Sequence, residues 1–510
     1  MFIRTVRQWS DPIVEALRPK NRRTEKKPRR SFRPSVEALE ARALPSVNPI
    51  IGDVIYIEME NHNLTQPSTV PPGTPQQLLG NAAAPYLNSL MTLNDPNAAQ
   101  TSYASAYYNA DYTNTTINGG NGVHPSEPNY VWQEAGLAGP FNDADPYPNN
   151  IVNAPNLSAL LQNAGISWKS YQEDIDLTPG SGTVNQPGAN SLSSTVASPS
   201  DWTVPLKRFS GTSATYTNAY NGSDQYDYAP KHDGTLFFTA TNGGNDFSPS
   251  NPEAPHYAPL QQFQTDLSNN SLAKYTLITP DQFNDMHSSL ASGFTYQGTH
   301  YTGDQASIAE GDNFLSQIVP KIMASQAYKN NGVIVLWFDE TEAGNTTSFT
   351  IPEIVISPLA KGNAYNSTLP YTHSSDLLSL QQLFGVSGPG GQFLGDSATP
   401  GTNNLSDMFV PGVFTPSSIS GTVFKNSGAD GQTEAGLTVV LTGTNDANQV
   451  ITLTTTTDAQ GHYSFTGLLP GTYSVHAPDA KKDPGISSIT LGSGESLEED
   501  FSLLGPNSHK

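Results

Sequence analysis

The chain contains no cysteine among its 510 residues. This absence excludes disulfide bonds and thiolate ligands, so any bound metal must use oxygen or imidazole ligands. No run of about 18 or more apolar residues occurs either, and we expect no membrane-spanning helix. The length exceeds that of one compact core, and 43 glycines with 40 prolines indicate a loop-rich globular protein of two or three units.

Basic side chains are scarce beyond the first 42 residues. Residues 1–42 hold 12 of the 24 Lys and Arg residues, whereas the other 468 residues hold 12 basic and 41 acidic side chains, a net charge of −29. The strong negative charge of these 468 residues argues against nucleic acid as a partner, because phosphate backbones bind basic surfaces. It suits an exported protein that works outside the cell or at its surface.

The N-terminal segment, residues 1–46, is basic and polar and lacks the apolar core of an ordinary secretory signal. Residues 29–44 are similar to an N-terminal sorting segment found on some bacterial exported proteins. The alternative is a disordered basic arm.

Residues 47–386 alternate apolar strands with amphipathic helices. Strands are expected at 54–59, 275–279, 332–338 and 354–357, and helices at 156–164, 307–325 and 376–383. This alternation predicts an α/β fold with a mostly parallel sheet and helices on both faces. The long polar stretches 95–122, 176–227 and 239–256 are expected to decorate the carboxyl edge of the sheet.

The composition changes after Val386. Residues 387–417 are rich in Gly, Ser, Pro and Thr and are predicted to form a linker. Residues 418–504 then predict a small antiparallel β-sandwich, because short alternating strands are separated by turns. Those strands are expected at 420–424, 437–441, 450–454, 463–465 and 472–475.

The C-terminal string Thr457–Tyr473 resembles the B-type repeats of bacterial surface adhesins and the carboxypeptidase regulatory-like domain. Such domains are spacers or stalks, so the resemblance implies association with the cell envelope. The calcium loop of these domains is reduced here to Gly428–Gly431, which argues against calcium binding.

Two strand ends carry pairs of oxygen ligands. Asp339 and Glu340 follow strand 332–338, and Glu60 and Asn61 follow the first strand. Open α/β sheets bind ligands at the carboxyl ends of their strands, and carboxylate and amide oxygens suit hard cations. Asp339 could instead cap a helix, and Glu60-Asn61 could be an ordinary turn. Two such strand ends together favour a shared ion site.

Ser126 lies between two prolines in the string His124–Tyr130. A serine on such a stiff backbone becomes a nucleophile when a metal lowers the pKa of its hydroxyl. The alternative is a polar loop with no catalytic role.

Histidines near predicted element ends are candidates for phosphate contact, a second metal or proton transfer. These are His232, His287, which follows Asp285 by two residues, and His373. A lone histidine is more often structural, and five are assigned that role: His62, His256, His300, His462 and His476.

Together these motifs resemble the phosphoesterase family, which holds bacterial phospholipases C and acid phosphatases within the alkaline phosphatase superfamily. The resemblance covers residues 50–386. It is carried, in order, by Glu60–Asn63, His124–Tyr130, Tyr228–His232, Phe263–Leu267, Thr279–His287, Gly311-Asp312, Phe338–Glu342 and Ser357-Pro358.

The resemblance implies a role for each matching position. The metal ligands would be Glu60, Asn61, Asp339 and Glu340, with Asp285 a weaker candidate. Ser126 would be the nucleophile, His124 and Asn129 would bind substrate, and His232, His287 and His373 would surround the phosphate. The chain departs from the family at Glu127, where leucine is common, and at Asp281, where asparagine is common. Glu127 would disfavour dianionic substrates.

The expected function is metal-dependent hydrolysis of small phosphate esters through a phosphoseryl intermediate, as in an acid phosphatase or phosphodiesterase. The rivals are a phospholipase C acting on lipid headgroups and a cell-surface structural protein with a degenerate enzyme fold. The oxygen ligands favour magnesium, manganese or calcium. Zinc is favoured if His287 and His373 bind a second ion with Asp285.

Overall fold

The computed structural model describes residues 50–70, 77–110, 122–140, 142–342, 348–425, 432–446, 448–478 and 486–503. The predicted N-terminal segment and the reduced calcium loop lie outside these ranges. Within them, no helix is both long enough and apolar enough to cross a membrane.

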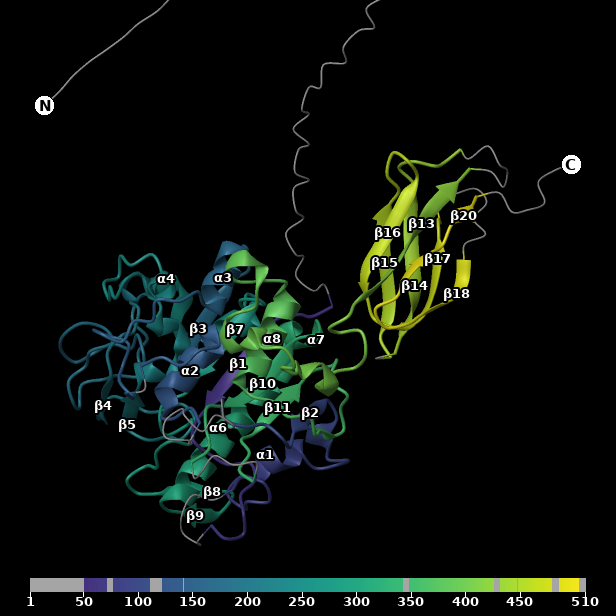
Figure 1. Ribbon diagram of the computed structural model, residues 1–510. Coiled ribbons are helices and arrows are strands. Elements are labelled where there is room, and N and C mark those ends of the chain that lie inside the picture. Colours follow the sequence, from purple (N-terminus) through teal and green to yellow (C-terminus); the bar gives the residue numbers. More distant parts are fainter. Residues whose placement is uncertain are drawn as a thin grey trace, which may run out of the picture. The chain divides into compact units, whose positions relative to one another are not determined.

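The described residues up to 416 are built on an eight-stranded mixed sheet (Figure 1). The strands are β1 (Val54–Met59), β2 (Thr101–Ala104), β3 (Trp168–Gln172), β6 (Tyr257–Pro259), β7 (Tyr275–Thr279), β10 (Val333–Phe338), β11 (Glu353–Ile356) and β12 (Tyr365–Ser367). Their order is β12-β2-β11-β10-β1-β7-β3-β6. Strand β11 runs antiparallel to β10 and β2, and the other neighbours are parallel. This confirms the predicted α/β class.

Helices cover both faces of the sheet. They are α1 (Pro85–Leu90), α2 (Ser126–Ala135), α3 (Leu157–Asn163), α4 (Thr239–Asn242), α5 (Leu260–Ser268), α6 (Asp304–Ala324), α7 (Gln326–Lys329) and α8 (His373–Phe384). The Tyr56 hydroxyl donates to Asp376 of α8, whereas Met59 lies against Gly311 of α6. Side chains alternate along β1, so positions 56 and 59 point to opposite faces. Every residue of β1 and β10 is buried, as a doubly covered sheet requires.

The Gly311-Asp312 motif fixes how α6 packs. A β-carbon at position 311 would overlap the side chain of Met286, so only glycine allows α6 to lie this close to the segment that carries Asp285. Asp312 accepts hydrogen bonds from the backbone N–H groups of Tyr86 (2.9 Å) and Leu87 (2.7 Å). These are early N–H groups of α1, which lack partners inside their own helix. Asp312 therefore caps α1 from a neighbouring helix.

The predicted helices correspond to α3, α6 and α8, and the predicted strands to β1, β7, β10 and β11. The prediction that the long polar stretches form loops at the edge of the sheet was only partly correct. Residues 95–122 contain β2, a strand inside the sheet, and residues 176–227 contain β4 (Phe209–Thr212) and all but the last residue of its hairpin partner β5 (Gln225–Tyr228). The sequence Thr-Ser-Tyr-Ala of β2 has no apolar run, so only its pairing with β11 and β12 defines it as a strand.

Residues 387–417 differ from the linker that their composition predicts. They contain three short 3₁₀ helices, Pro389–Gly391, Gly395–Ala398 and Leu405–Met408. Leu394 and Met408 are buried in the same core as the main sheet. A few apolar residues among the glycines and prolines are therefore enough to anchor most of this segment to that core.

The C-terminal unit is all-β, as predicted. Its strands are β13 (Ser417–Phe424), β14 (Thr438–Asn445), β15 (Val450–Thr456), β16 (His462–Leu468), β17 (Gly471–His476), β18 (Ile486–Leu491), β19 (Ser496–Glu498) and β20 (Phe501–Ser502). One sheet has the order β16-β13-β19, with β20 also on β13, and the other has the order β15-β14-β17-β18. Burial alternates strictly along β13, and Ile419 and Val423 share one core with Val439 and Leu441 of β14.

Candidate active site

The two predicted pairs of oxygen ligands meet at one edge of the sheet. Strands β1 and β10 are parallel neighbours, with Met59 opposite Phe338, so the residues that follow them emerge side by side. Asn61 adopts a positive φ of 30°, which asparagine tolerates better than most residues. Its backbone N–H donates to Asp339 Oδ1 at 2.8 Å. Because β10 ends at Phe338, strand alternation does not force Asp339 and Glu340 to opposite faces.

Ser126 lies at these strand ends as the first residue of α2. Its hydroxyl donates to Glu60 Oε2 at 2.9 Å, and Oγ lies 3.3 Å from Asn61 Oδ1 and 3.5 Å from Glu340 Oε1. The start of a helix carries partial positive charge, which favours an alkoxide or a phosphate oxygen there. The structure therefore places the predicted nucleophile among the predicted ligands.

Tyr130 is a site residue that the sequence analysis missed. Its hydroxyl donates to Glu60 Oε1 at 2.7 Å. Its ring stacks on that of His232, with centroids 5.3 Å apart and planes at 12°. Tyr130 follows Ser126 by four residues in α2, and residues at this spacing share a helix face. That spacing is the signal that would have identified it.

His232 lies between two of the predicted metal ligands. Its Nε2 is 3.4 Å from Glu60 Oε1, and its Nδ1 is 3.4 Å from Asp285 Oδ2. The His287 ring centroid is 5.7 Å from that of His232, and the His287 backbone N–H donates to Asp285 Oδ1 at 2.7 Å. Burial lowers the pKa of His232 well below its usual value and that of His287 to about 4. Both rings are therefore neutral at pH 7 in this environment.

The two predicted substrate-binding residues flank Glu340. His124 Nδ1 pairs with Glu340 Oε2, and Asn129 Nδ2 lies 3.4 Å from the same oxygen. The Asn129 amide also donates to the Val123 carbonyl at 3.1 Å, which holds the loop before α2. Asn129 Oδ1 has no hydrogen-bond partner in the described part of the chain. Contact of either residue with substrate stays a prediction.

His373 lies beside the site, but its ring nitrogens are already engaged. Trp337 Nε1–H donates to His373 Nδ1 at 3.1 Å, so the proton is on Nε2, which donates to the Asp339 carbonyl at 2.5 Å. With both nitrogens occupied, His373 has no N–H left to donate to a phosphate oxygen. We therefore assign His373 to positioning Asp339. Because both nitrogens of His373 are engaged, the alternative zinc site of His287, His373 and Asp285 lacks one of its ligands. The imidazole nitrogen that lies beside Asp285 belongs to His232 instead.

Buried negative charge is concentrated at this site. Burial raises the pKa of Glu60 to about 7 and raises those of Asp285, Asp339 and Glu340 well above their usual values, with the charge of Glu60 adding to the effect at all three. So many buried carboxylates require protons or a cation for charge balance. Among the described residues, none donates a hydrogen bond to Asp339 Oδ2 or Asp285 Oδ2.

Four of these residues, Glu60, Asn61, Asp339 and Glu340, offer carboxylate and amide oxygens from adjacent strand ends. Hard divalent cations prefer such ligands. The free Asp339 oxygen and the unfavourable concentration of like charge both fit a cation at this position.

A model of the phosphoesterase family matches residues 101–387, more than half of the chain, and the chain belongs to this family. The family is a class of phosphoric ester hydrolases, and the match confirms the resemblance that the motifs indicated. Ser126 and Asp339-Glu340 lie inside the matched stretch, whereas Glu60-Asn61 precede it. A carboxypeptidase regulatory-like domain matches residues 418–504, as predicted for the C-terminal unit.

Individual proteins match smaller parts. A probable acid phosphatase of Kluyveromyces lactis is 25% identical over 222 residues, which are 43% of this chain and 39% of the relative. A probable rhamnogalacturonate lyase A of Aspergillus terreus is 30% identical over 146 residues, 28% of this chain and 26% of the relative. The chain thus spans well under half the length of either relative.

Among solved structures, a protein in the alkaline phosphatase superfamily from Vibrio parahaemolyticus is similar to this chain at 10% identity with a TM-score of 0.36. The match covers 87% of this chain and 84% of that one.

Proposed function

We propose that this chain hydrolyses phosphate esters with Ser126 as the nucleophile. The observation that carries the proposal is the position of Ser126 Oγ at the start of α2, 2.9 Å from Glu60 Oε2 and 3.3 Å from Asn61 Oδ1. A serine among oxygen ligands for a cation suits phosphoryl transfer, because the transferred group is highly charged. Membership of the phosphoesterase family supports the same chemistry.

The reaction would proceed as two in-line displacements. Ser126 Oγ attacks phosphorus and forms a phosphoserine, while the bond from phosphorus to the departing alcohol breaks. The hydroxyl proton leaves along the hydrogen bond to Glu60 Oε2. Water then attacks the phosphoserine and gives up a proton to the histidine that protonated the alcohol, the bond between Oγ and phosphorus breaks, and Oγ takes back the proton from Glu60 as phosphate leaves.

A divalent cation on Glu60, Asn61, Asp339 and Glu340, whether magnesium, manganese, calcium or zinc, would neutralise charge on the phosphate and lower the pKa of the serine hydroxyl. His232 and His287 are the residues proposed to donate N–H groups to phosphate oxygens and a proton to the departing alcohol. Both are neutral in this environment, and a bound phosphate anion would raise their pKa and charge one of them.

The chemical test combines one substitution with chelation. We expect Ser126→Ala to lower kcat/KM for 4-nitrophenyl phosphate or bis(4-nitrophenyl) phosphate by roughly a thousandfold or more. Dialysis against EDTA should have a similar effect, and added Mg²⁺, Mn²⁺, Ca²⁺ or Zn²⁺ should restore activity. The matched control is Ser316→Ala, which removes a half-buried hydroxyl from α6 that donates to the Asn313 carbonyl.

The same assay separates the rival functions. Preference for phosphatidylcholine over both nitrophenyl esters would indicate a phospholipase C. An intact, metal-loaded protein that hydrolyses none of these compounds would indicate a structural protein with a degenerate site. Activity that survives in Ser126→Ala would rule out the proposed nucleophile.

We further propose that the protein is exported and displayed at the cell surface. The carboxypeptidase regulatory-like domain supports this, as does the strongly acidic composition. Fractionation of cells that express the full chain tests it, and protein recovered only from the cytoplasm would contradict it.

A further inference from the structure

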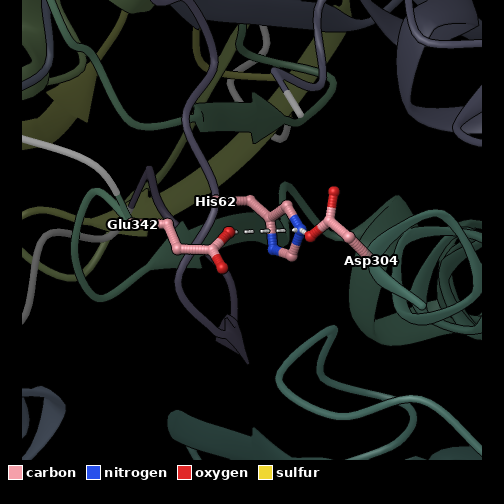
Figure 2. A group of neighbouring side chains, drawn as sticks. All are labelled: His62, Asp304 and Glu342. Atoms are coloured by element: carbon pink, nitrogen blue, oxygen red, sulfur yellow. Dashed lines mark hydrogen bonds and ion pairs between the residues drawn. The ribbon is translucent and has the colours of Figure 1, made fainter. Parts of the chain in front are cut away.

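A second group of metal-ligand side chains has two members on loops that carry the proposed active site and a third on α6. His62 follows Asn61, Glu342 comes two residues after Glu340, and Asp304 is the first residue of α6. Figure 2 shows the His62 imidazole between the two carboxylates. His62 Nε2 is 3.2 Å from Asp304 Oδ1 and 3.9 Å from Glu342 Oε2. The sequence analysis gave His62 only a structural role.

The orientation of the His62 ring is determined by its other nitrogen. Nδ1 lies 3.2 Å from the backbone carbonyl of Glu60, and a carbonyl oxygen can only accept, so Nδ1 carries the proton. In the neutral ring the lone pair of Nε2 therefore faces the carboxylates of Asp304 and Glu342. Two carboxylates and a lone pair repel one another unless a proton or a cation lies between them. Metal-bound histidines commonly donate their second N–H to a carbonyl in this way.

We propose that His62, Asp304 and Glu342 form a second divalent cation site, distinct from the proposed active site and suited to zinc or manganese. The three ligand atoms lie within 4.8 Å of one another. Ligands about 2.1 Å from a tetrahedral ion are roughly 3.4 Å apart. The distance from His62 to Asp304, 3.2 Å, is close to this value, and the distance from His62 to Glu342, 3.9 Å, exceeds it by about half an ångström.

Burial and access both suit an exchangeable ion. The His62 side chain is 3% exposed, whereas those of Asp304 and Glu342 are 26% and 34% exposed. The imidazole is thus held rigidly while the two carboxylates face solvent, from which an ion and a water ligand can enter. One imidazole and two carboxylates are a ligand set that zinc and manganese accept.

Such an ion would join three separate elements: the loop after β1, the loop after β10 and the N-terminus of α6. The first two loops also carry Glu60-Asn61 and Asp339-Glu340. The second ion would therefore hold the active-site loops together without contacting substrate. This role is structural and does not depend on the proposed hydrolysis.

Metal counting on the full chain tests the proposal. Protein stripped with EDTA is titrated with ZnCl₂ or MnCl₂ and analysed by calorimetry and by elemental analysis after gel filtration. We expect two classes of binding in the natural protein. Asp304→Asn combined with Glu342→Gln should remove one class and keep the other. Asp339→Asn combined with Glu340→Gln should do the reverse, so failure of either site is distinguishable.

The matched control removes carboxylates from two isolated histidine pairs. In Glu253→Gln combined with Asp458→Asn, the contacts of His256 with Glu253 (3.6 Å) and of His462 with Asp458 (3.3 Å) are lost. Both binding classes should remain. Glu342→Gln alone, at an exposed position that tolerates exchange, should weaken the second class by at least about tenfold. Unchanged binding in both Glu342→Gln and the Asp304/Glu342 double variant would overturn the proposal and leave His62 paired through a proton.

Discussion

The proposed active-site group (Glu60, Asn61, Ser126, Asp339 and Glu340) and the proposed second group (His62, Asp304 and Glu342) share two loops but differ in burial. Glu60 and Asp339 are completely buried, and burial raises the pKa of both. Asp304 and Glu342 are partly exposed, so water screens their charges. The active-site group therefore needs a cation or protons to be stable at all. The second group gains from a cation but can also be balanced by a proton on His62.

The two groups also differ in what lies at their centre. The active-site group surrounds a hydroxyl at the start of a helix, whereas the second group surrounds an imidazole. A hydroxyl can become a nucleophile, but an imidazole with both nitrogens engaged can only bind. Position on a shared pair of loops therefore does not imply a shared role.

After the Ser126→Ala substitution described above, the largest expected effect comes from a change that tests this difference directly. Asp339→Asn removes a ligand from the active-site group, and we expect kcat/KM to fall on the order of a hundredfold or more, as for loss of a group that stabilises transition-state charge. Asp304→Asn, the same change in the second group, should cost less than about tenfold. Phosphatase assays at saturating metal measure both. Equal losses would mean that the two groups form one functional unit.

A smaller effect should follow from disturbing the support of the active-site group. The Tyr107 hydroxyl lies between Asp376 and Nδ1 of His373, which is 2.8 Å away, and its single proton is shared between these two acceptors; the His373 ring in turn holds the Asp339 carbonyl. Tyr107→Phe should lower kcat by roughly fivefold with KM changed by less than about twofold, since one buried hydrogen bond is worth about 1 kcal/mol.

The control for this change is Tyr171→Phe. It removes a hydroxyl of β3, two strands from β1 in the sheet, that donates to Asp266 at 2.6 Å. Both variants should lose similar thermal stability. If they also lose the same activity, the effect of Tyr107 is one of stability and His373 is not a positioning residue.

The smallest expected effect depends on pH. Burial raises the pKa of Glu127 to about 7, and its carboxylate accepts backbone hydrogen bonds from Asn142 and Asp143. Below pH 7 the group is mostly protonated and resembles glutamine. Above pH 7 its charge repels a dianionic ester. Glu127→Gln should leave kcat/KM unchanged at pH 5.5 and raise it roughly two- to threefold at pH 8.5 for a monoester.

The same group contributes to stability with a defined sign. Its folded pKa is raised, so its contribution is fully present below the unfolded value near 4 and is lost as pH rises through about 7. Glu127→Gln should therefore gain Tm relative to the natural protein as pH rises from 5 to 8. A rate ratio or a Tm difference that is constant across this range would contradict the assignment.

Local sequence patterns predicted Glu60, Asp339 and Ser126 as members of the proposed active-site group. The apolar runs of β1 and β10 end directly at Glu60 and Asp339, and parallel strands in one sheet deliver such residues to the same edge. Ser126 could be identified because its motif resembles the family. The pairing of His232 with Asp285, by contrast, joins residues on separate loops, and neither sequence neighbourhood indicates the other.

In two other segments, tertiary packing produced a structure that the local composition does not predict. Residues 387–417 have the composition of a linker, yet Leu394 and Met408 are buried. Residues 101–104 have no strand-like run, yet they form β2 between β11 and β12. In both cases neighbouring elements supply the buried surface and the hydrogen bonds that the segment itself does not encode.

By itself the sequence determined the α/β class, the strand ends that carry Glu60 and Asp339, the Ser126 motif and the all-β C-terminal unit. Each of these depends on residues close together in the chain, whose periodicity and order are directly visible. Only the tertiary structure decided that His62 faces Asp304, 242 residues away, and that Nε2 of His373 is bound to the Asp339 carbonyl. Those contacts are set by how α6 and α8 pack on opposite faces of the sheet, and helix packing joins residues that no local pattern relates.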